Sequence, residues 1–192
     1  FKNFYSSYFF NKKFKKPYIS AKIAISKDFY SINKKSKWIT NEHSRKIGHL
    51  LRSRNDCIFS TSKTINVDNS LLNCRIEGFN NYKPDLFIID LNLKLKKKLS
   101  LIKIARKRKT FLITLIKNKK KALFFKKKGF KIIFIKSLRT KNDFNLMLKH
   151  IFRLGYSRAF FETGLTFLNT LLDFKLVNYL YLFQNKNKNG KN

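Results

Sequence analysis

Apolar residues recur at every second position near the start of the chain. Ile19, Ala21, Ile23 and Ile25 alternate with other residues, which is the period of a strand with one buried face. Short apolar runs farther along are typical of buried strands. These runs lie at residues 57–61, 85–90, 110–115, 130–136, 158–162 and 177–183. We therefore predict a sheet built from these segments.

Helical spacing separates the predicted strands. Thr40 or Asn41 is a candidate N-cap for a helix that places Ile47, Leu50 and Leu51 on one face. The Lys-rich connections between the strands at 85–90, 110–115 and 130–136 are interpreted as helices with lysine on their outer faces.

Two more helices follow toward the end of the chain. Thr140 and Asp143 have the spacing of a capping box, and Gly155 is placed to end the helix that they begin. Residues 166–174 form a shorter helical segment. Alternating strands and helices predict an α/β protein with three layers, α/β/α, around a mainly parallel sheet.

The domain boundary is placed at Pro17. Residues 1–16 mix aromatic and basic side chains without a clean period, so we interpret them as a basic arm or linker remnant. Residues 17–192 are long enough for one domain, and 43% apolar residues across the chain are enough for a core. Because the chain begins with Phe1 and shows no signal peptide, we expect a further part upstream.

The formal net charge of +34 raises the question of a polyanionic partner. Lys, Asn, Ile, Phe and Tyr are abundant together, however, which indicates a general bias in residue usage. Lysine also far outnumbers arginine, the residue that suits phosphate and base recognition best. We therefore favour solvated lysines over nucleic-acid binding, and keep a basic RNA- or ribosome-binding protein as the alternative function.

Membrane insertion and metal binding find no support in the sequence. No apolar run approaches the roughly 20 residues that span a bilayer. Cys57 and Cys74 lack the spacing of a zinc site or a disulfide framework, which fits a reducing cytoplasm. We expect a cytoplasmic protein with no metal site and no membrane partner.

A turn between a strand and a helix is the first candidate site. Gly164 would let the backbone approach a ligand, and the amides of Leu165, Thr166 and Phe167 would open a helix that can bind phosphate. A tight turn that merely needs glycine is the competing interpretation. Glu162, just before the turn, is either a surface ion-pair partner or a hydrogen-bond acceptor for a substrate.

Two arginines also draw notice in a chain that mostly uses lysine. Arg52 and Arg75 offer planar, bidentate donors that suit a carboxylate or a phosphate, although each could be a solvated surface residue. The three histidines show no metal-ligand spacing, and no catalytic residue can be assigned.

Three motifs resemble the reductase domain of the bifunctional riboflavin-biosynthesis deaminase/reductase. The first is Ser-Lys-Trp-Ile-Thr at residues 36–40, followed by a helix that ends Leu-Leu-Arg. The second runs from Thr64 through Asp68 to Arg75, and the third is the Glu-Thr-Gly turn at 162–164. Their order and spacing agree with that family over nearly the whole chain.

The resemblance implies a dihydrofolate-reductase-like fold and an activity. The expected reaction is the NADPH-dependent reduction of 5-amino-6-(5-phosphoribosylamino)uracil to the ribitylamino compound. The substrate contacts that match by position are Ser36, Arg52, Leu72, Arg75 and Glu162. The matching cofactor contacts are Ala24, Trp38, Thr64, Asp68, Gly164, Leu165, Thr166, Phe167, Leu168, Asn169 and Thr170. The resemblance also implies an upstream deaminase domain and a homodimer.

The chain departs from the family pattern at several positions. Phe29 replaces a usual glycine, Ser70 an expected proline, Leu91 a cofactor-side serine and Thr163 a glycine. A catalytically decayed reductase with the same fold is therefore a third interpretation, which an activity assay would separate from the active enzyme.

Overall fold

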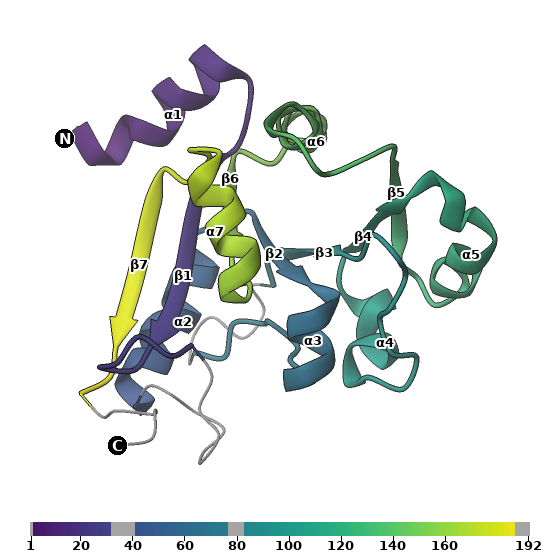
Figure 1. Cartoon of the computed structure of the whole chain (residues 1–192), viewed down its shortest axis with the longest axis horizontal. Coiled ribbons are helices and arrows are strands. Elements are labelled where there is room, and N and C mark those ends of the chain that lie inside the picture. The colour runs from purple at the N-terminus through teal and green to yellow at the C-terminus, as the bar shows by residue number, and fades with distance from the viewer. Residues whose placement is uncertain (1, 32–40, 77–82, 187–192) are drawn as a thin grey trace.

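A single parallel sheet organises the molecule. The computed structural model describes residues 2–31, 41–76 and 83–186. Seven strands pair side by side in the order β5-β4-β3-β2-β6-β1-β7, and every pair is parallel (Figure 1). The strands are β1 Tyr18–Ile25, β2 Cys57–Thr61, β3 Asp85–Ile89, β4 Thr110–Leu115, β5 Lys131–Ile135, β6 Arg158–Phe161 and β7 Tyr179–Gln184. Each one lies where the sequence predicts a strand.

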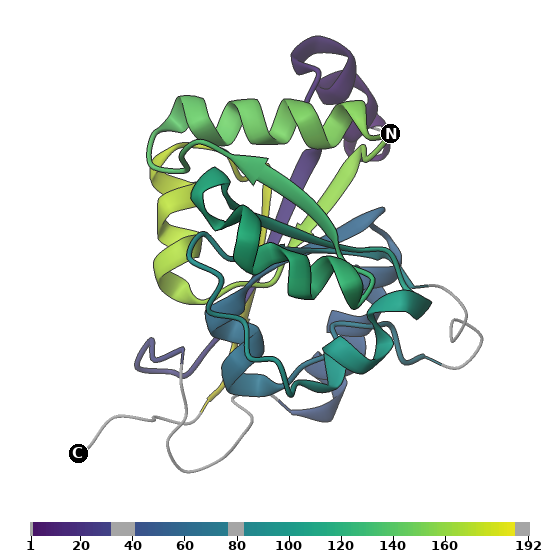
Figure 2. The same ribbon diagram turned by 90° about the vertical axis from the view of Figure 1, so that its right-hand side faces the viewer.

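Helices connect the strands and cover the sheet (Figures 1 and 2). The α-helices are α1 Lys2–Phe14, α2 Glu42–Ser53, α3 Ser62–Asp68, α4 Ser100–Ile104, α5 Lys119–Lys127, α6 Lys141–Arg153 and α7 Leu165–Asp173. Two short 3-10 helices, η1 Ala105–Lys107 and η2 Ile116–Asn118, precede β4 and α5. The side chain of Asn41 accepts a hydrogen bond from Ser44 N, and Thr140 and Asp143 form the predicted capping box.

The two faces of the sheet carry separate cores, because neighbouring residues of a strand point to opposite sides. On one face, Phe59, Phe87, Phe111 and Phe161 stack across adjacent strands under the buried side of α6 and α7. The residues between them, such as Ile58, pack with α3, α4 and α5. This arrangement confirms the three-layer α/β/α fold.

Two helices were not foreseen. Residues 2–14 form α1 although their sequence shows no period, and the side chain of Asn11 fixes this helix by donating to the carbonyls of Lys16 (2.6 Å) and Ser157 (3.1 Å). The segment is thus helical rather than irregular, and the predicted division of the chain at Pro17 stays a prediction. The other unforeseen helix, α3, has only Ile65 as a buried apolar residue.

Within the described residues, no helix has the length and apolar character needed to cross a membrane. The same part of the chain holds no group of three or more His, Cys, Asp or Glu residues that could bind a metal ion.

Candidate active site

Charged side chains meet at the carboxyl ends of β1, β2 and β6. Glu162 directly follows β6, and its carbonyl accepts a hydrogen bond from the Ser60 hydroxyl of β2 at 2.7 Å. Ala21 of β1 pairs with Phe161, so Lys22 is level with Glu162. Both side chains therefore point to the face opposite the stacked phenylalanines.

Arg52, near the end of α2, binds Glu162 through both carboxylate oxygens. Its Nε donates to Oε1 at 2.5 Å and its Nη2 donates to Oε2 at 2.8 Å. Only 15% of the Arg52 side chain and 12% of the Glu162 side chain are exposed. Burial alone would raise the pKa of Glu162, but the Arg52 guanidinium and the nearby Lys22 outweigh it and hold that pKa below its ordinary value. Glu162 is thus an ionised, oriented carboxylate.

Lys22 completes this cluster. Burial lowers the pKa of its ammonium group, Glu162 and Asp68 oppose that shift, and Arg52 adds to it. Its Nζ also lies 5.4 Å from the centre of the Phe183 ring. An ammonium group that is partly desolvated beside an ion pair can release its proton more readily than a surface lysine.

His49, one turn before Arg52, joins α2 to the segment that carries Arg75. Its Nδ1 lies 3.2 Å from Arg52 Nη1, 3.2 Å from the Arg75 amide and 3.0 Å from the Asn73 carbonyl oxygen. Burial and then the Arg52 charge lower the pKa of this imidazole. The imidazole of α2 thus links the Arg52 guanidinium to the backbone of residues 73–75.

The turn after Glu162 presents the N-terminus of α7. Gly164 is the N-cap, and no side chain caps the helix. The hydroxyl oxygen of Thr163 is buried and, among the described residues, has no hydrogen-bond partner. A Cβ on Gly164 would lie 3.8 Å from the hydroxyl of Thr64, so the start of α3 borders this turn. An unsatisfied hydroxyl beside open helix amides is suited to a phosphate group.

Some predicted site residues can act only through their backbone or lie elsewhere. Leu72 and Leu168 are buried in the two cores, 5% and 2% exposed, so their side chains are not accessible to a ligand. The Phe167 amide already donates to the Gly164 carbonyl. Ser36 and Trp38 lie outside the described residues.

The remaining predicted residues lie on β1, α3 and α7 and in the segment after α3. Ala24 follows Lys22 by two positions in β1 and so shares its face of the sheet. Thr64 and Asp68 both belong to α3, and Asp68 is close enough to Lys22 to act on its pKa. Arg75 is exposed next to the His49 ring. Leu165, Thr166, Asn169 and Thr170 all belong to α7.

Lys22 and His49 escaped the sequence interpretation. Lys22 alternates with apolar residues in a strand, and that pattern by itself predicts a solvent-facing lysine. His49 sits three residues before Arg52, and this spacing places the two on one helix face. The alternation around Lys22 and the three-residue spacing of His49 and Arg52 are both visible in the sequence. Neither pattern distinguishes a residue of a functional site from a surface residue.

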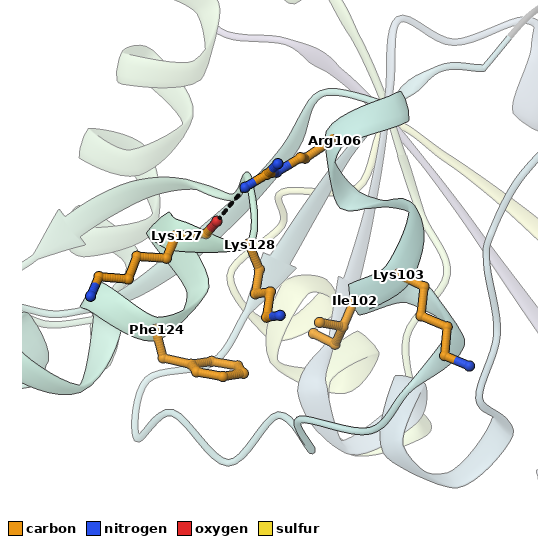
Figure 3. A pocket seen from close by; sticks show the side chains of 6 residues that line it. All are labelled: Ile102, Lys103, Arg106, Phe124, Lys127 and Lys128. Carbon is orange, nitrogen blue, oxygen red and sulfur yellow. Dashed lines mark hydrogen bonds between the residues drawn. The ribbon is translucent and has the colours of Figure 1, made fainter.

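A basic hollow of about 460 Å³ lies away from this cluster, between α4, η1 and α5 (Figure 3). Its lining is Ile102, Lys103, Arg106, Phe124, Lys127 and Lys128. It contains no carboxylate and none of the predicted site residues. We therefore place the candidate active site at Lys22, Arg52 and Glu162 instead.

Solved structures of similar fold come from riboflavin-biosynthesis proteins. Acinetobacter baumannii RibD matches with a TM-score of 0.83 and 17% identity, over 99% of this chain and 52% of that one. A Thermotoga maritima deaminase/reductase gives 0.78 and 18%, over 99% and 50%. The Saccharomyces riboflavin biosynthesis reductase Rib7 gives 0.70 and 19%, over 99% and 84%. This chain spans about half the length of the first two.

Sequence comparison gives the family directly. No curated protein sequence matches this chain. The family model of the RibD C-terminal domain, however, matches residues 17–185, which include Lys22, Arg52 and Glu162. The fold, the matched residues and the related structures agree, and the chain belongs to the RibD C-terminal domain family, a family of reductase domains in riboflavin biosynthesis.

Proposed function

We propose that this domain reduces 5-amino-6-(5-phosphoribosylamino)uracil to 5-amino-6-(5-phosphoribitylamino)uracil with NADPH. The observation that carries the proposal is the partly buried cluster of Lys22, Arg52 and Glu162 beside the uncapped N-terminus of α7. The cluster offers charge and a proton for a sugar, and the helix N-terminus offers amides for a pyrophosphate.

The cofactor side of the cleft fits a dinucleotide. Thr163 Oγ1 supplies an unsatisfied hydroxyl, Gly164 lets a phosphate approach the backbone, and Leu165 and Thr166 supply the first amides of α7. Thr64 borders the same turn. When bound, NADPH supplies the hydride.

Two arginines, Arg52 and Arg75, are available to bind the substrate. Arg52 already binds Glu162 and also donates from Nη1 to the Asn73 carbonyl at 2.9 Å. Arg75 is exposed, so its guanidinium can take a phosphate at a low desolvation cost. We assign the sugar phosphate mainly to Arg75, with Arg52 adding positive charge.

Lys22 is the proposed proton donor. Opening the sugar ring leaves a double bond between C1 and the amine nitrogen. The hydride adds to C1, the electron pair of that bond moves to the nitrogen, and the nitrogen takes one proton. Lys22 Nζ holds a proton whose pKa burial lowers, whereas both oxygens of the ionised Glu162 are occupied by Arg52.

Two substitutions of Lys22 test this role. Lys22→Met removes charge and proton, and Lys22→Arg keeps the charge but cannot release a proton near neutral pH. We expect both to lower kcat by about a hundredfold or more while NADPH affinity stays close to that of the wild type, because general acid catalysis contributes factors of this size. Substrate-dependent loss of NADPH absorbance measures kcat.

Lys131→Met is the matched control, since this lysine is exposed on β5 at the other edge of the sheet. It should behave as the wild type. If Lys22→Arg kept wild-type kcat, Lys22 would act through its charge alone and the proton assignment would be wrong.

We also propose that this domain works in the cytoplasm as part of a bifunctional chain with an upstream deaminase domain, and as a homodimer. The support is the resemblance stated above and the length of the RibD relatives, which is about twice that of this chain.

A further inference from the structure

The segment between Asn69 and Ile76, which carries Leu72 and Arg75, contains no helix or strand. Leu72 has a φ of 49°, in the left-handed region that a leucine rarely occupies. Such a backbone needs partners from elsewhere to hold it, since no ladder of strand hydrogen bonds satisfies its carbonyls.

Arg108 supplies those partners. This arginine lies between η1 and β4 and is only 6% exposed. Its Nη1 donates to the Leu71 carbonyl at 2.7 Å, its Nη2 to the Leu72 carbonyl at 3.1 Å and its Nε to the Pro84 carbonyl at 2.7 Å. The planar fork thus ties the segment to the start of β3.

The next carbonyl along the chain is bound by the other buried arginine. Asn73 accepts from Arg52, the arginine that binds Glu162. Three consecutive carbonyls are therefore held by two arginines, Arg108 from the core and Arg52 from the charged cluster. Burial lowers the pKa of Arg108 to about 10, which leaves the guanidinium charged at neutral pH.

We infer that Arg108 is a positioning residue, which sets the backbone of Leu71 and Leu72 and thereby the place of Arg75 in the substrate side of the cleft. The effect on substrate rests on the proposed function, whereas the effect on the segment does not. Lysine cannot replace it, because a single ammonium group cannot span three carbonyls with the geometry of the fork.

The test compares Arg108→Lys with Arg106→Lys. Arg106 is the matched control, an exposed arginine two residues away that donates to the Lys127 carbonyl (Figure 3). We expect Arg108→Lys to speed amide hydrogen exchange in residues 70–76 and to raise substrate KM by about tenfold, as expected for lost charge-assisted hydrogen bonds, with kcat and NADPH affinity within about twofold of the wild type. Arg106→Lys should change none of these.

The outcomes separate the two claims. Unchanged exchange in residues 70–76, or unchanged KM beside an active wild type, would overturn the positioning role. A uniform rise in exchange over the whole domain, with KM, kcat and cofactor affinity all impaired, would show that Arg108 only stabilises the fold. If the wild type does not reduce the substrate at all, the proposed function fails, and the exchange comparison alone decides whether Arg108 orders the segment.

Discussion

Arg52 and Arg75 look alike in the sequence but occupy different surroundings in the structure. The Arg52 side chain is mostly buried and donates hydrogen bonds to Glu162 and to the Asn73 carbonyl, whereas Arg75 is exposed. From the sequence, both suit a carboxylate or a phosphate, and substrate binding by either stays a prediction. The geometry adds that the two residues should respond differently to the same substitution.

Replacing each arginine by lysine separates their roles. Arg75→Lys should raise substrate KM by about tenfold, since the bidentate fork is lost, and leave stability unchanged. Arg52→Lys should also lower the free energy of unfolding by about 1–3 kcal/mol, because Glu162 and the Asn73 carbonyl lose donors in a partly buried place. Urea unfolding and steady-state kinetics measure the two effects. Wild-type KM in Arg75→Lys would remove Arg75 from the phosphate site.

Single residues also mark the limit of sequence interpretation. Lys22 was missed because a lysine within an alternating strand predicts exposure, and only the pairing of β1 with β6 brings it level with Glu162. Arg108 was missed because it lies in the basic run Arg-Lys-Arg-Lys, where its neighbours are surface cations. The motif residues Arg52 and Glu162, by contrast, were singled out from the sequence, and the structure brings them into direct contact, while their role in binding substrate stays a prediction.

At the scale of elements, strands were easier to predict than helices. Apolar alternation identifies β1, and apolar runs identify the other strands, of which β2, β3, β4 and β6 are buried on both faces. The α3 helix, which carries Thr64 and Asp68, was missed because a helix of seven residues with one buried apolar side chain leaves almost no period. The helix therefore came from the structure, whereas Thr64 and Asp68 were singled out by the motif.

The start of α7 allows a clean test of the cofactor site. Gly164 has a φ of −69°, and a Cβ there would make only an ordinary contact with Thr64. Gly164→Leu should therefore fold with a stability loss of about 1 kcal/mol or less, yet weaken NADPH binding by about tenfold or more, because its side chain would occupy the approach to the helix amides.

Gly155→Ala serves as the control for that variant. Gly155 has a φ of +96° at the end of α6, so alanine there should lower the melting temperature without changing cofactor affinity. Fluorescence titration of NADPH and thermal unfolding report both quantities. If Gly164→Leu bound NADPH as tightly as the wild type, the cofactor's pyrophosphate would not lie at this turn.

At the scale of the whole molecule, positive charge gathers away from the cleft. Every charged residue between Asp90 and Asp143 is a Lys or Arg, and this part of the chain forms β4, α5, β5 and the hollow of Figure 3. The carboxylates Glu162 and Asp68 lie instead with Lys22, near the other edge of the sheet. Much of the net positive charge therefore comes from a part of the chain that contributes none of the candidate site residues.

Transfer of an isotope from NADPH to the product shows whether this domain catalyses the hydride transfer. The wild-type domain is incubated at physiological salt with the phosphoribosylaminopyrimidine and with NADPH deuterated at the transferable position. Mass spectrometry then measures the mass of the product. The account predicts a ribityl product that carries one deuterium at C1, and a strongly reduced yield with Lys22→Met. Folded wild-type domain that binds NADPH but forms no deuterated product would contradict the account and favour the decayed reductase.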